Sequence, residues 1–334
     1  MIKMLNDQGI ILVNKDSGKT SAAVVAQLRK LLGMKRVGHC GTLDPFATGV
    51  LPIVFGRATA AVPYMINYDK KYRCQIQLGA RTDTMDLEGE VVARAPEDFD
   101  LSRLADRSYL EAVINSFQGE IQQQAPLYSA VKVDGKALYK YARQEEEVER
   151  PWRSVTVYEL ELLDLYYVET EKFPRLDVKF FTSKGTYIRS LADAIGEKLG
   201  CYAYAAELVR TDSGPFGLDQ TVKVDDLFAR FNELGRSSKA FLDAITTENK
   251  VLPTLAAFDA YPTYALQRHE ALQLAHGQKI TLSDQETSHA TITFTYNNIL
   301  IAVGSVEQGA VEVKRVFVDS AAKFLHEGSV DEDI

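Results

Sequence analysis

The 334-residue sequence predicts an α+β fold, in which helices flank a mixed, mostly antiparallel sheet and a small β-rich domain follows. Strand-like and helix-like segments follow one another without the regular βαβ rhythm of a parallel sheet. Residues 71–78 alternate between apolar and polar side chains, as a half-buried strand does. From about residue 251, short alternating runs separated by Asn or Gly turns replace the helical patterns. The length suggests about two domains, which we place at residues 1–250 and 251–334.

The first part of the chain contains a strand, a helix and a second strand. Residues 9–13 are typical of a short buried strand, and residues 15–18 of a turn. Apolar residues recur at helical spacing over residues 21–32, and Gly33 follows them as a helix stop. Residues 50–55 then predict another strand.

The middle of the chain contains a helix and an irregular segment. A capping-box pattern at Ser108 and Glu111 predicts a helix that Gly119 closes. Residues 122–153 hold an apolar cluster, a Val-Asp-Gly turn, a helical stretch and an acidic run. We therefore expect this segment to be an excursion from the core.

The pattern becomes regular again towards the end of the first domain. Residues 176–180 alternate as a strand, residues 183–185 predict a turn, and an apolar stripe over residues 188–199 predicts a helix that ends at Gly200. A polar joint at residues 246–250 precedes the second domain. The alternating runs of that domain cover residues 290–296, 299–303 and 311–317.

Composition excludes several classes of protein. No apolar run approaches the roughly 18 to 20 residues that a membrane span needs, and the start lacks the features of a signal peptide, so we expect a cytoplasmic protein. Cys40, Cys74 and Cys201 form neither a C-x-x-C pair nor a zinc-spaced cluster. We therefore expect reduced thiols and no structural metal.

The charge is unevenly distributed. The formal net charge of −8 argues against a polyanionic ligand, but residues 1–57 carry eight Lys or Arg and three Asp or Glu, a net of +5. Residues 251–334 carry five and eleven, a net of −6. The basic end could face phosphates, although a solvated surface explains the same pattern.

The most unusual stretch is GHCGTLDPFATGVLP, residues 38–52. Its glycines permit backbone conformations and close approaches that a Cβ forbids, and its prolines stiffen the chain around them. Such a loop can hold one carboxylate, Asp44, at the bottom of a site, although Asp-Pro is also a common turn initiator. It is not a phosphate loop, because it lacks the G-x-x-x-x-G-K-[ST] pattern.

Five ordered segments between residues 8 and 220 resemble the bacterial TruB family of tRNA pseudouridine synthases. They are GHCGTLDPFATGVLP, KKYRCQIQLGARTDTMDLEG, QQQAPLYSAVKVDGKALYKYAR, SKGTYIRSLADAIGEKLG and LVRTDSGPFG. The resemblance implies a pseudouridine-synthase sheet, an RNA-gripping thumb inserted at residues 122–152 and a PUA-like C-terminal domain at residues 251–334. It also implies a monomeric isomerase that converts uridine 55 in the T loop of tRNA to pseudouridine without a cofactor.

The resemblance assigns roles to three catalytic residues. Asp44 of the TLDP turn matches the catalytic aspartate, Tyr72 of KKYRC the aromatic that stacks on the target base, and Arg189 of TYIRS the arginine that pairs with the aspartate. Taken alone, Tyr72 suits a core position and Arg189 a surface salt bridge. Arg189 lies near the start of its predicted helix, where a cation meets the positive end of the dipole, and this suggests a carboxylate partner.

Three further residues are expected to contact the substrate. His39 of GHCG matches a histidine associated with opening the T loop, Lys15 a lysine near the same cleft, and Tyr187 lies in the TYIRS motif. Two positions depart from the family pattern: Cys40 replaces a usual threonine and Ala125 a usual proline. Neither change removes an ionisable catalytic group.

The expected chemistry breaks the bond from uracil N1 to the sugar and joins C5 to C1′. A carboxylate can attack C1′ or remove the 2′ proton, and it must be ionised for either role. A neighbouring guanidinium favours the ionised form against the desolvation of a closed pocket. Two other functions stay open: an RNA-binding or RNA-folding module, and a synthase guided by RNA within a protein complex. The thumb-like insertion favours the self-guided enzyme.

Overall fold

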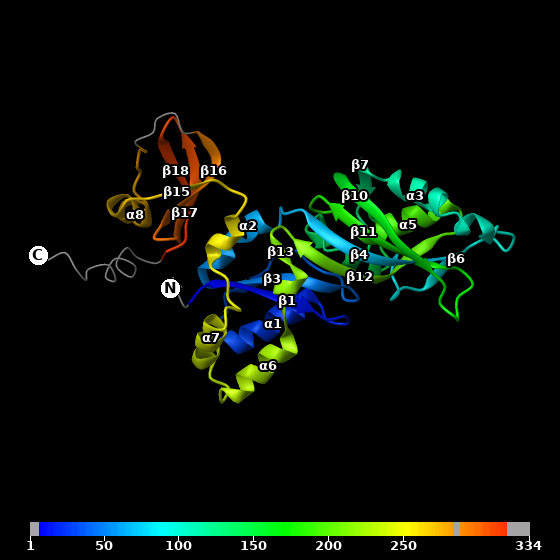
Figure 1. Ribbon diagram of the computed structural model, residues 1–334, viewed down its shortest axis with the longest axis horizontal. Coiled ribbons are helices and arrows are strands. Elements are labelled where there is room, and N and C mark those ends of the chain that lie inside the picture. Colours follow the sequence, from blue (N-terminus) through cyan, green and yellow to red (C-terminus); the bar gives the residue numbers. More distant parts are fainter. Residues whose placement is uncertain (1–6, 283–287, 319–334) are drawn as a thin grey trace, which may run out of the picture.

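The computed structural model describes residues 7–282 and 288–318. It confirms the predicted fold class, since a large mixed sheet is flanked by helices and a small β-rich part lies at one end of the molecule (Figure 1). Seven of the eleven acidic residues counted in residues 251–334 lie outside the described residues, as do the first six residues of the chain. No helix in the described ranges is long and apolar enough to cross a membrane.

The main sheet has ten strands. They are β1 (Gly9–Lys15), β2 (Val37–His39), β3 (Thr48–Phe55), β4 (Lys70–Leu78), β7 (Gly119–Gln124), β10 (Trp152–Tyr166), β11 (Arg175–Thr182), β12 (Ala203–Ser213), β13 (Phe216–Gly217) and β14 (Val222–Lys223). The spatial order is β14-β1-β3-β12-β4-β11-β10-β7, with β2 beside β3 and β13 beside β12. Of the pairs in this order, β1–β14 and β3–β12 are parallel and the others antiparallel.

Helices cover one face of the sheet in two groups. The helices of the first part of the chain are α1 (Ser21–Leu32), α2 (Val62–Met65), α3 (Arg107–Asn115), α4 (Leu138–Arg143), α5 (Ile188–Leu199), α6 (Val224–Glu233) and α7 (Ser238–Thr247), with short 3₁₀ turns at Gly56–Ala61, Leu101–Ala105 and Leu218–Gln220. Helices α1, α6 and α7 lie together near β1, and α3 and α5 lie near β10 and β12 (Figure 1). Both groups share one apolar core with the sheet.

The α1 helix forms as its sequence predicts. The Thr20 hydroxyl accepts a hydrogen bond from the Ala23 N–H at its start, and Gly33 ends it in the left-handed conformation with φ of 64°. The apolar stripe between them is buried in the core. This helix and the turn before it support one side of the segment that carries Asp44.

The helix predicted around residue 110 has different ends from those expected. Asp106, and not Ser108, caps α3 by accepting the Tyr109 N–H, and Glu111 pairs with Arg107 instead of closing a capping box. The helix ends at Asn115, so Gly119 does not close it but opens β7. The reason is a competing cap two residues upstream, because Asp also caps helices well.

The segment between β7 and β10 leaves the core as predicted, although residues 122–124 and 152–153 of the predicted excursion belong to these two strands. Gln124 pairs with Trp152, so the chain departs and returns at the same point of the sheet. In between lie a hairpin of β8 (Lys132–Val133) and β9 (Lys136–Ala137), and helix α4. Asp134 and Gly135 both have positive φ at its turn, which suits the predicted Asp-Gly pair. Another small sheet pairs β5 (Ala80–Thr82) with β6 (Val91–Arg94).

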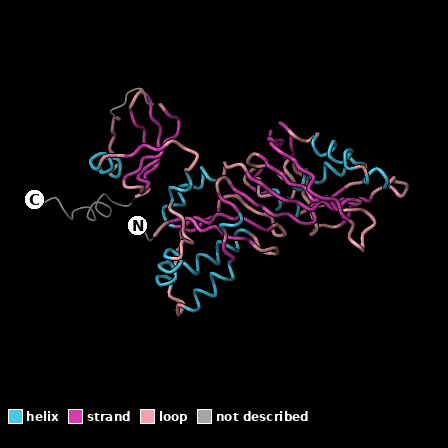
Figure 2. The backbone as a smooth tube through the Cα atoms, in the orientation of Figure 1, coloured by secondary structure: helices cyan, strands magenta, loops and turns pink. Residues whose placement is uncertain are grey.

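The C-terminal part, in its described residues, forms its own four-stranded sheet with one helix (Figure 2). It contains β15 (Thr263–Ala265), α8 (Arg268–Ala275), β16 (His289–Tyr296), β17 (Ile299–Glu307) and β18 (Ala310–Val316), which confirms the three predicted runs. A separate apolar cluster fills it. The polar joint is shorter than expected, because Thr246 and Thr247 still belong to α7.

The two parts of the molecule share an apolar contact. One face of β1 turns Ile10 and Leu12 away from the helices and towards Phe258 and Phe317. Phe258 ends a 3₁₀ turn at Thr254–Phe258, which links the parts. Before it, the Leu252 N–H donates to the Ile10 carbonyl at 2.8 Å, so the chain stays attached to the first sheet at this point.

Candidate active site

Asp44 lies in the loop of residues 40–47 between β2 and β3, which we call the Asp44 loop. Ser21, at the start of α1, holds this loop through both backbone groups of Leu43, accepting the N–H at 2.9 Å and donating to the carbonyl at 3.1 Å. The Pro45 carbonyl accepts from the Gly18 N–H at 2.9 Å and from the Lys15 ammonium at 2.9 Å. The loop is therefore fixed on both sides of Asp44.

Arg189 pairs with Asp44 and with a second carboxylate. Its Nε lies 2.9 Å from Asp44 Oδ2, its Nη2 3.3 Å from Asp44 Oδ1 and its Nη1 3.0 Å from Asp86 Oδ2. The remaining N–H groups donate to the Thr84 carbonyl at 2.5 Å and the Tyr128 carbonyl at 2.9 Å. All five guanidinium donors thus have acceptors, which fixes the side chain in one orientation.

This ion pair is buried and not the surface bridge that sequence alone also allowed. The side chains of Arg189 and Asp86 are 3% and 6% exposed, whereas that of Asp44 is 30% exposed. The Arg189 guanidinium therefore lies at the buried side of the site, and Asp44 is the one of these three side chains that is accessible to solvent. Two carboxylates around one buried cation give the group a net negative charge.

Burial and the neighbouring charges act on Asp44 in opposite directions. Burial raises the pKa of Asp44 above its ordinary value, and the negative charge of Asp86 adds to this rise. The charge of Arg189 and its hydrogen bonds lower the same pKa, and Lys15 contributes a smaller lowering. Burial outweighs them, so we expect the carboxylate to lose its proton at a higher pH than a free aspartate does.

A cavity of about 550 Å³ opens in front of Asp44. The Asp44 loop forms one wall, residues 129–131 of the excursion another, and residues 185–188, just before and at the start of α5, a third. Tyr72, Leu208 and Arg210 line it from the central strands. The volume is within the range of small-ligand pockets, so a single nucleotide fits.

Comparison with known proteins identifies the family. Residues 29–188 match the family model described as TruB family pseudouridylate synthase (N terminal domain), and residues 189–246 match the tRNA pseudouridylate synthase B C-terminal domain. The tRNA pseudouridine synthase B of Stutzerimonas stutzeri (strain A1501) is 41% identical over 309 residues, which cover 92% of this chain and 95% of that protein. This chain belongs to the TruB family of pseudouridylate synthases.

Two other similarities agree with membership of the TruB family. The tRNA pseudouridine synthase B of Geobacillus kaustophilus (strain HTA426) is 48% identical over 226 residues, covering 66% of this chain and 76% of that protein. A chain in a structure described as a Cbf5-Nop10-Gar1 complex superposes with a TM-score of 0.66 at 25% identity, covering 94% of this chain and 86% of that chain. The fold thus extends over both parts of the molecule.

Tyr72 borders the cavity in front of Asp44 and also belongs to the apolar core. It lies on β4 with Cys74 and Ile76 on the apolar face, and it is 8% exposed. One side of the side chain nevertheless lines the cavity with Asp44. The structure therefore joins the two alternatives that the sequence left open, a core tyrosine and a tyrosine that faces the site.

The structure places the other three predicted residues at different distances from the cavity. Tyr187 lines it, and the side chain of Gln123 fixes Tyr187 by bonding both its N–H and its carbonyl. Lys15 is buried behind the Asp44 loop, where burial lowers its pKa to about 8 against the opposing charge of Asp44. His39 lies on β2 and does not line the cavity, and burial lowers its pKa.

Sequence reasoning missed two residues of the site. Asp86 lies in the KKYRCQIQLGARTDTMDLEG motif, from which only Tyr72 was selected, and Arg210 lies in LVRTDSGPFG, from which no residue was selected. The signal for both was the motif itself. Neither side chain shows by its position in the sequence that it binds Arg189, as Asp86 does, or the carbonyls around Asp44, as Arg210 does.

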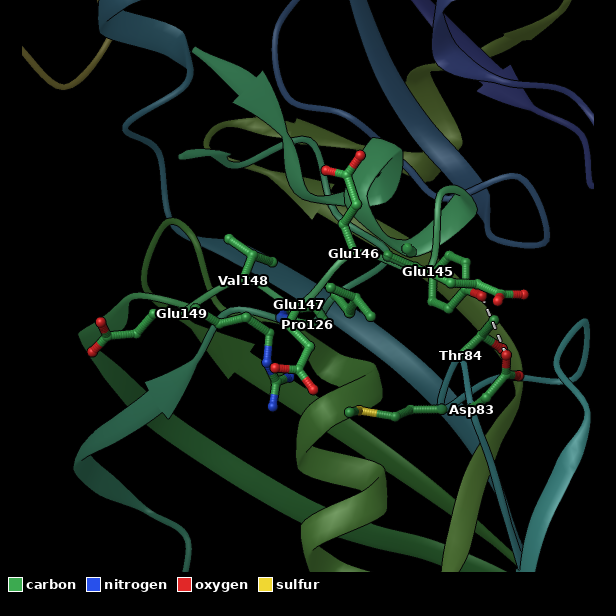
Figure 3. Close-up of a pocket in the computed structure, with 13 residues that line it drawn as sticks. Asp83, Thr84, Pro126, Glu145, Glu146, Glu147, Val148 and Glu149 are labelled. Carbon is green, nitrogen blue, oxygen red and sulfur yellow. Dashed lines mark hydrogen bonds between the residues drawn. The ribbon is translucent and has the colours of Figure 1, made fainter. Parts of the chain in front are cut away.

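A second hollow lies on the other side of residues 83–85 and 126–128. It measures about 860 Å³, and its rim carries Glu145, Glu146, Glu147 and Glu149 (Figure 3). The acidic run predicted for the excursion therefore gathers around this hollow and not around Asp44. Because carboxylates repel phosphates, an RNA backbone is expected to avoid it.

Proposed function

We propose that this protein isomerises uridine 55 in the T loop of tRNA to pseudouridine, without a cofactor and without a guide RNA. The observation that carries the proposal is Asp44, held by Arg189 at 2.9 Å and open to a nucleotide-sized cavity beside Tyr72. Relatives named tRNA pseudouridine synthase B, similar over most of the chain, support tRNA as the substrate. The reaction is an isomerisation, so no redox partner or hydrolytic water enters it.

Asp44 is the group that acts on the sugar. In one course its carboxylate attacks C1′ as the bond to uracil N1 breaks, and in the other it takes the 2′ proton to give a glycal. The freed base turns and C5 joins C1′, either as the bond from Asp44 to C1′ breaks or as the 2′ proton returns to the glycal. The C5 proton is then lost and N1 gains one. Arg189 orients the carboxylate for either course, and Asp86 in turn fixes Arg189.

The remaining residues hold the flipped nucleotide and its loop. The Tyr72 ring stacks on the uracil, a contact that contributes roughly 1 to 3 kcal/mol in other proteins. Tyr187 lies on the cavity wall and contacts the same nucleotide. Lys15 supports the Asp44 loop from behind through the Pro45 carbonyl. His39, at the edge of the sheet, meets the T loop as it opens.

RNA reaches the cavity between the excursion and the main sheet. Residues 122–152 act as the thumb, because residues 129–131 form one wall of the cavity. Lys70 and Arg153 line the same cavity, and the exposed Arg153 offers positive charge to phosphates, whereas the buried Lys70 ammonium donates to the Ile66 and Tyr68 carbonyls. Such single-stranded loops are the usual targets of specific RNA recognition, since their bases can be extruded.

We further propose that the chain works as a monomer in the cytoplasm, with residues 1–250 as the catalytic domain and residues 251–334 as a PUA-like domain. The separate sheet and core of the C-terminal part support this division. Its contact through Phe258 and Phe317 holds it against the first sheet.

Tritium release from tRNA labelled at uridine C5 tests the proposed function. The purified protein alone is expected to release close to one tritium per tRNA. A requirement for an added RNA or protein would favour a guide-dependent synthase. Binding of tRNA without any release would favour a module that binds or folds RNA.

Replacement of Asp86 by Asn is expected to lower the single-turnover rate by about 10- to 100-fold, because Arg189 loses one of its two ionic contacts and misplacement of a catalytic group by about 1 Å can cost that much. It also removes a negative charge that raises the pKa of Asp44. Because Asp44 acts when ionised, and its pKa falls in the variant, the acidic limb of the pH–rate profile should move to lower pH.

The matched control for this prediction is Asp193→Asn, which breaks a partly buried bridge to Arg81 away from the cavity. It should leave the rate and the position of the acidic limb unchanged. An Asp86→Asn variant with the wild-type rate and profile would show that the second carboxylate is unimportant to Asp44.

Affinity for tRNA is expected to fall about tenfold or more between roughly 50 and 200 mM salt, since two or more phosphate contacts release counterions regardless of the net charge of −8. Filter binding over this range measures the slope. A flat affinity would exclude the basic face at the cavity.

A further inference from the structure

Arg210 occupies the centre of the main sheet. It lies on β12, paired with Gly49 on the β3 side and with Tyr72 on the β4 side, and it is 1% exposed. The register of β12 against β4 shifts directly after Arg210. Such bulges are common beside active sites, where they re-aim a side chain. Arg210 therefore sits between the strand that carries Tyr72 and the one that follows the Asp44 loop.

The guanidinium of Arg210 binds carbonyl groups on both sides of Asp44. Nη2 donates to the Gly41 carbonyl at 3.1 Å and Nη1 to the Thr42 carbonyl at 3.4 Å, both before Asp44. Nε donates to the Val50 carbonyl at 2.8 Å, after the loop has joined β3. One side chain thus ties the two ends of the Asp44 loop together.

Arg210 is also the strand partner of Tyr72 on β4, and the charge of its guanidinium opposes the rise in the Tyr72 pKa that burial causes. Among the described residues, no carboxylate lies within ion-pair distance of Arg210, in contrast to Arg189 with two. Burial of a cation without an ionic partner is costly, and the carbonyls offset only part of this cost. Burying a neutral apolar residue at this strand position would cost less free energy. The buried charge and the planar guanidinium with its several donors therefore call for an explanation.

Two glycines lie close to Arg210, Gly41 in the Asp44 loop and Gly49 on β3. Gly49 has a φ of 102°, and a Cβ there would lie 2.2 Å from the Arg210 carbonyl oxygen, which is closer than atoms can approach. Gly41 has the same φ, and a Cβ on it would lie 3.5 Å from Arg210 Nη1. Gly49 therefore permits a close approach of the β12 backbone at Arg210, whereas the distance at Gly41 is an ordinary contact.

We propose that Arg210 is a positioning residue that holds the Asp44 loop in place beside Tyr72, so that carboxylate and ring face the same nucleotide. The proposal rests on the roles proposed above for Asp44 and Tyr72. Arg210 acts through these two residues: its side-chain donors bind backbone carbonyls before and after Asp44, and its backbone pairs with Tyr72, whereas Arg189 contacts the reacting carboxylate itself.

A double-mutant cycle tests this role. Arg210→Lys keeps the charge but loses the planar guanidinium and its several donors. Tyr72→Phe keeps the ring but loses the hydroxyl. The third variant combines the two substitutions. Single-turnover rates and tRNA affinity are measured for each variant. Arg210→Lys should lower the rate by about tenfold or more, with affinity within about threefold of wild type. The combined variant should be about fivefold or more faster than the product of the two single losses predicts, because the residues act together.

Arg73→Lys is the matched control. Arg73 lies next to Tyr72 on β4 and pairs with Asp177 away from the cavity, so its loss should leave rate and affinity unchanged. Three results would overturn the proposal: a wild-type rate for Arg210→Lys, losses that multiply fully in the combined variant, or a loss explained by tRNA affinity alone.

A buried lysine can also unfold a chain, so Arg210→Gln is measured in parallel as a neutral variant that keeps hydrogen-bond donors. The same cycle applies to it, and melting temperature reports folding. Loss of the folded state in both variants would make Arg210 a folding residue and count against the proposal. Wild-type protein that makes no pseudouridine would instead overturn the proposed function, which separates the two failures.

Discussion

Replacement of Asp44 by Asn is expected to abolish pseudouridine formation, with a loss of about 1,000-fold or more in the single-turnover rate. Asn keeps the size of the side chain but can neither attack C1′ nor take the 2′ proton. Arg189 keeps Asp86 and two backbone carbonyls as acceptors, so the back of the site should stay folded. Affinity for tRNA should remain within a few-fold, since phosphate contacts and stacking supply most of it.

The rate and the affinity are measured on the same preparation, by tritium release and by filter binding. Asp16→Asn is the control, because Asp16 lies near the Asp44 loop and pairs with Lys19 near the surface. It should behave as wild type. Formation of pseudouridine by the Asp44→Asn variant at a substantial fraction of the wild-type rate would refute the assignment of Asp44.

Replacement of Tyr72 by Leu is expected to lower turnover by about 100-fold, because an unsupported uracil is misplaced relative to Asp44. The ring is buried on its other side, so some loss of stability should accompany this, roughly 1 to 3 kcal/mol from lost packing and a lost hydroxyl partner. The loss of rate should exceed anything that the fraction of unfolded protein explains. Tyr72→Phe keeps the stacking face and should retain much more activity than Leu.

Melting temperature and single-turnover rate of the two Tyr72 variants decide between the roles. A large fall in melting temperature with a proportionate loss of activity would leave Tyr72 as core packing alone. Equal loss in Leu and Phe would assign the role to the hydroxyl and not to the ring.

Local patterns predicted the fold well where one interaction decides the conformation. The apolar period and the closing glycine defined α1, and strict alternation defined β4 together with the buried face of Tyr72. The start of α3 was wrong because Asp106 and Ser108 are both good caps, and only the packing of the chain selects one of them.

The site was predictable only where a long motif carried it. Asp44 and Arg189 came from two such motifs, and the structure brings them together across 145 residues of sequence. Asp86 and Arg210 were missed because their partners are set by long-range contacts: Asp86 lies 103 residues from Arg189, and Arg210 reaches carbonyls about 160 residues away. Spacing along the chain carries no information on such pairs.

Position-resolved mapping of pseudouridine in a tRNA transcript, after a single turnover with the purified protein and no other macromolecule, tests the central claim most directly. We expect one pseudouridine per transcript, at uridine 55 of the T loop, and none when that uridine is replaced by cytidine or when Asp44 is replaced by Asn. Pseudouridine at other positions with uridine 55 unmodified, or none at all, would contradict the account.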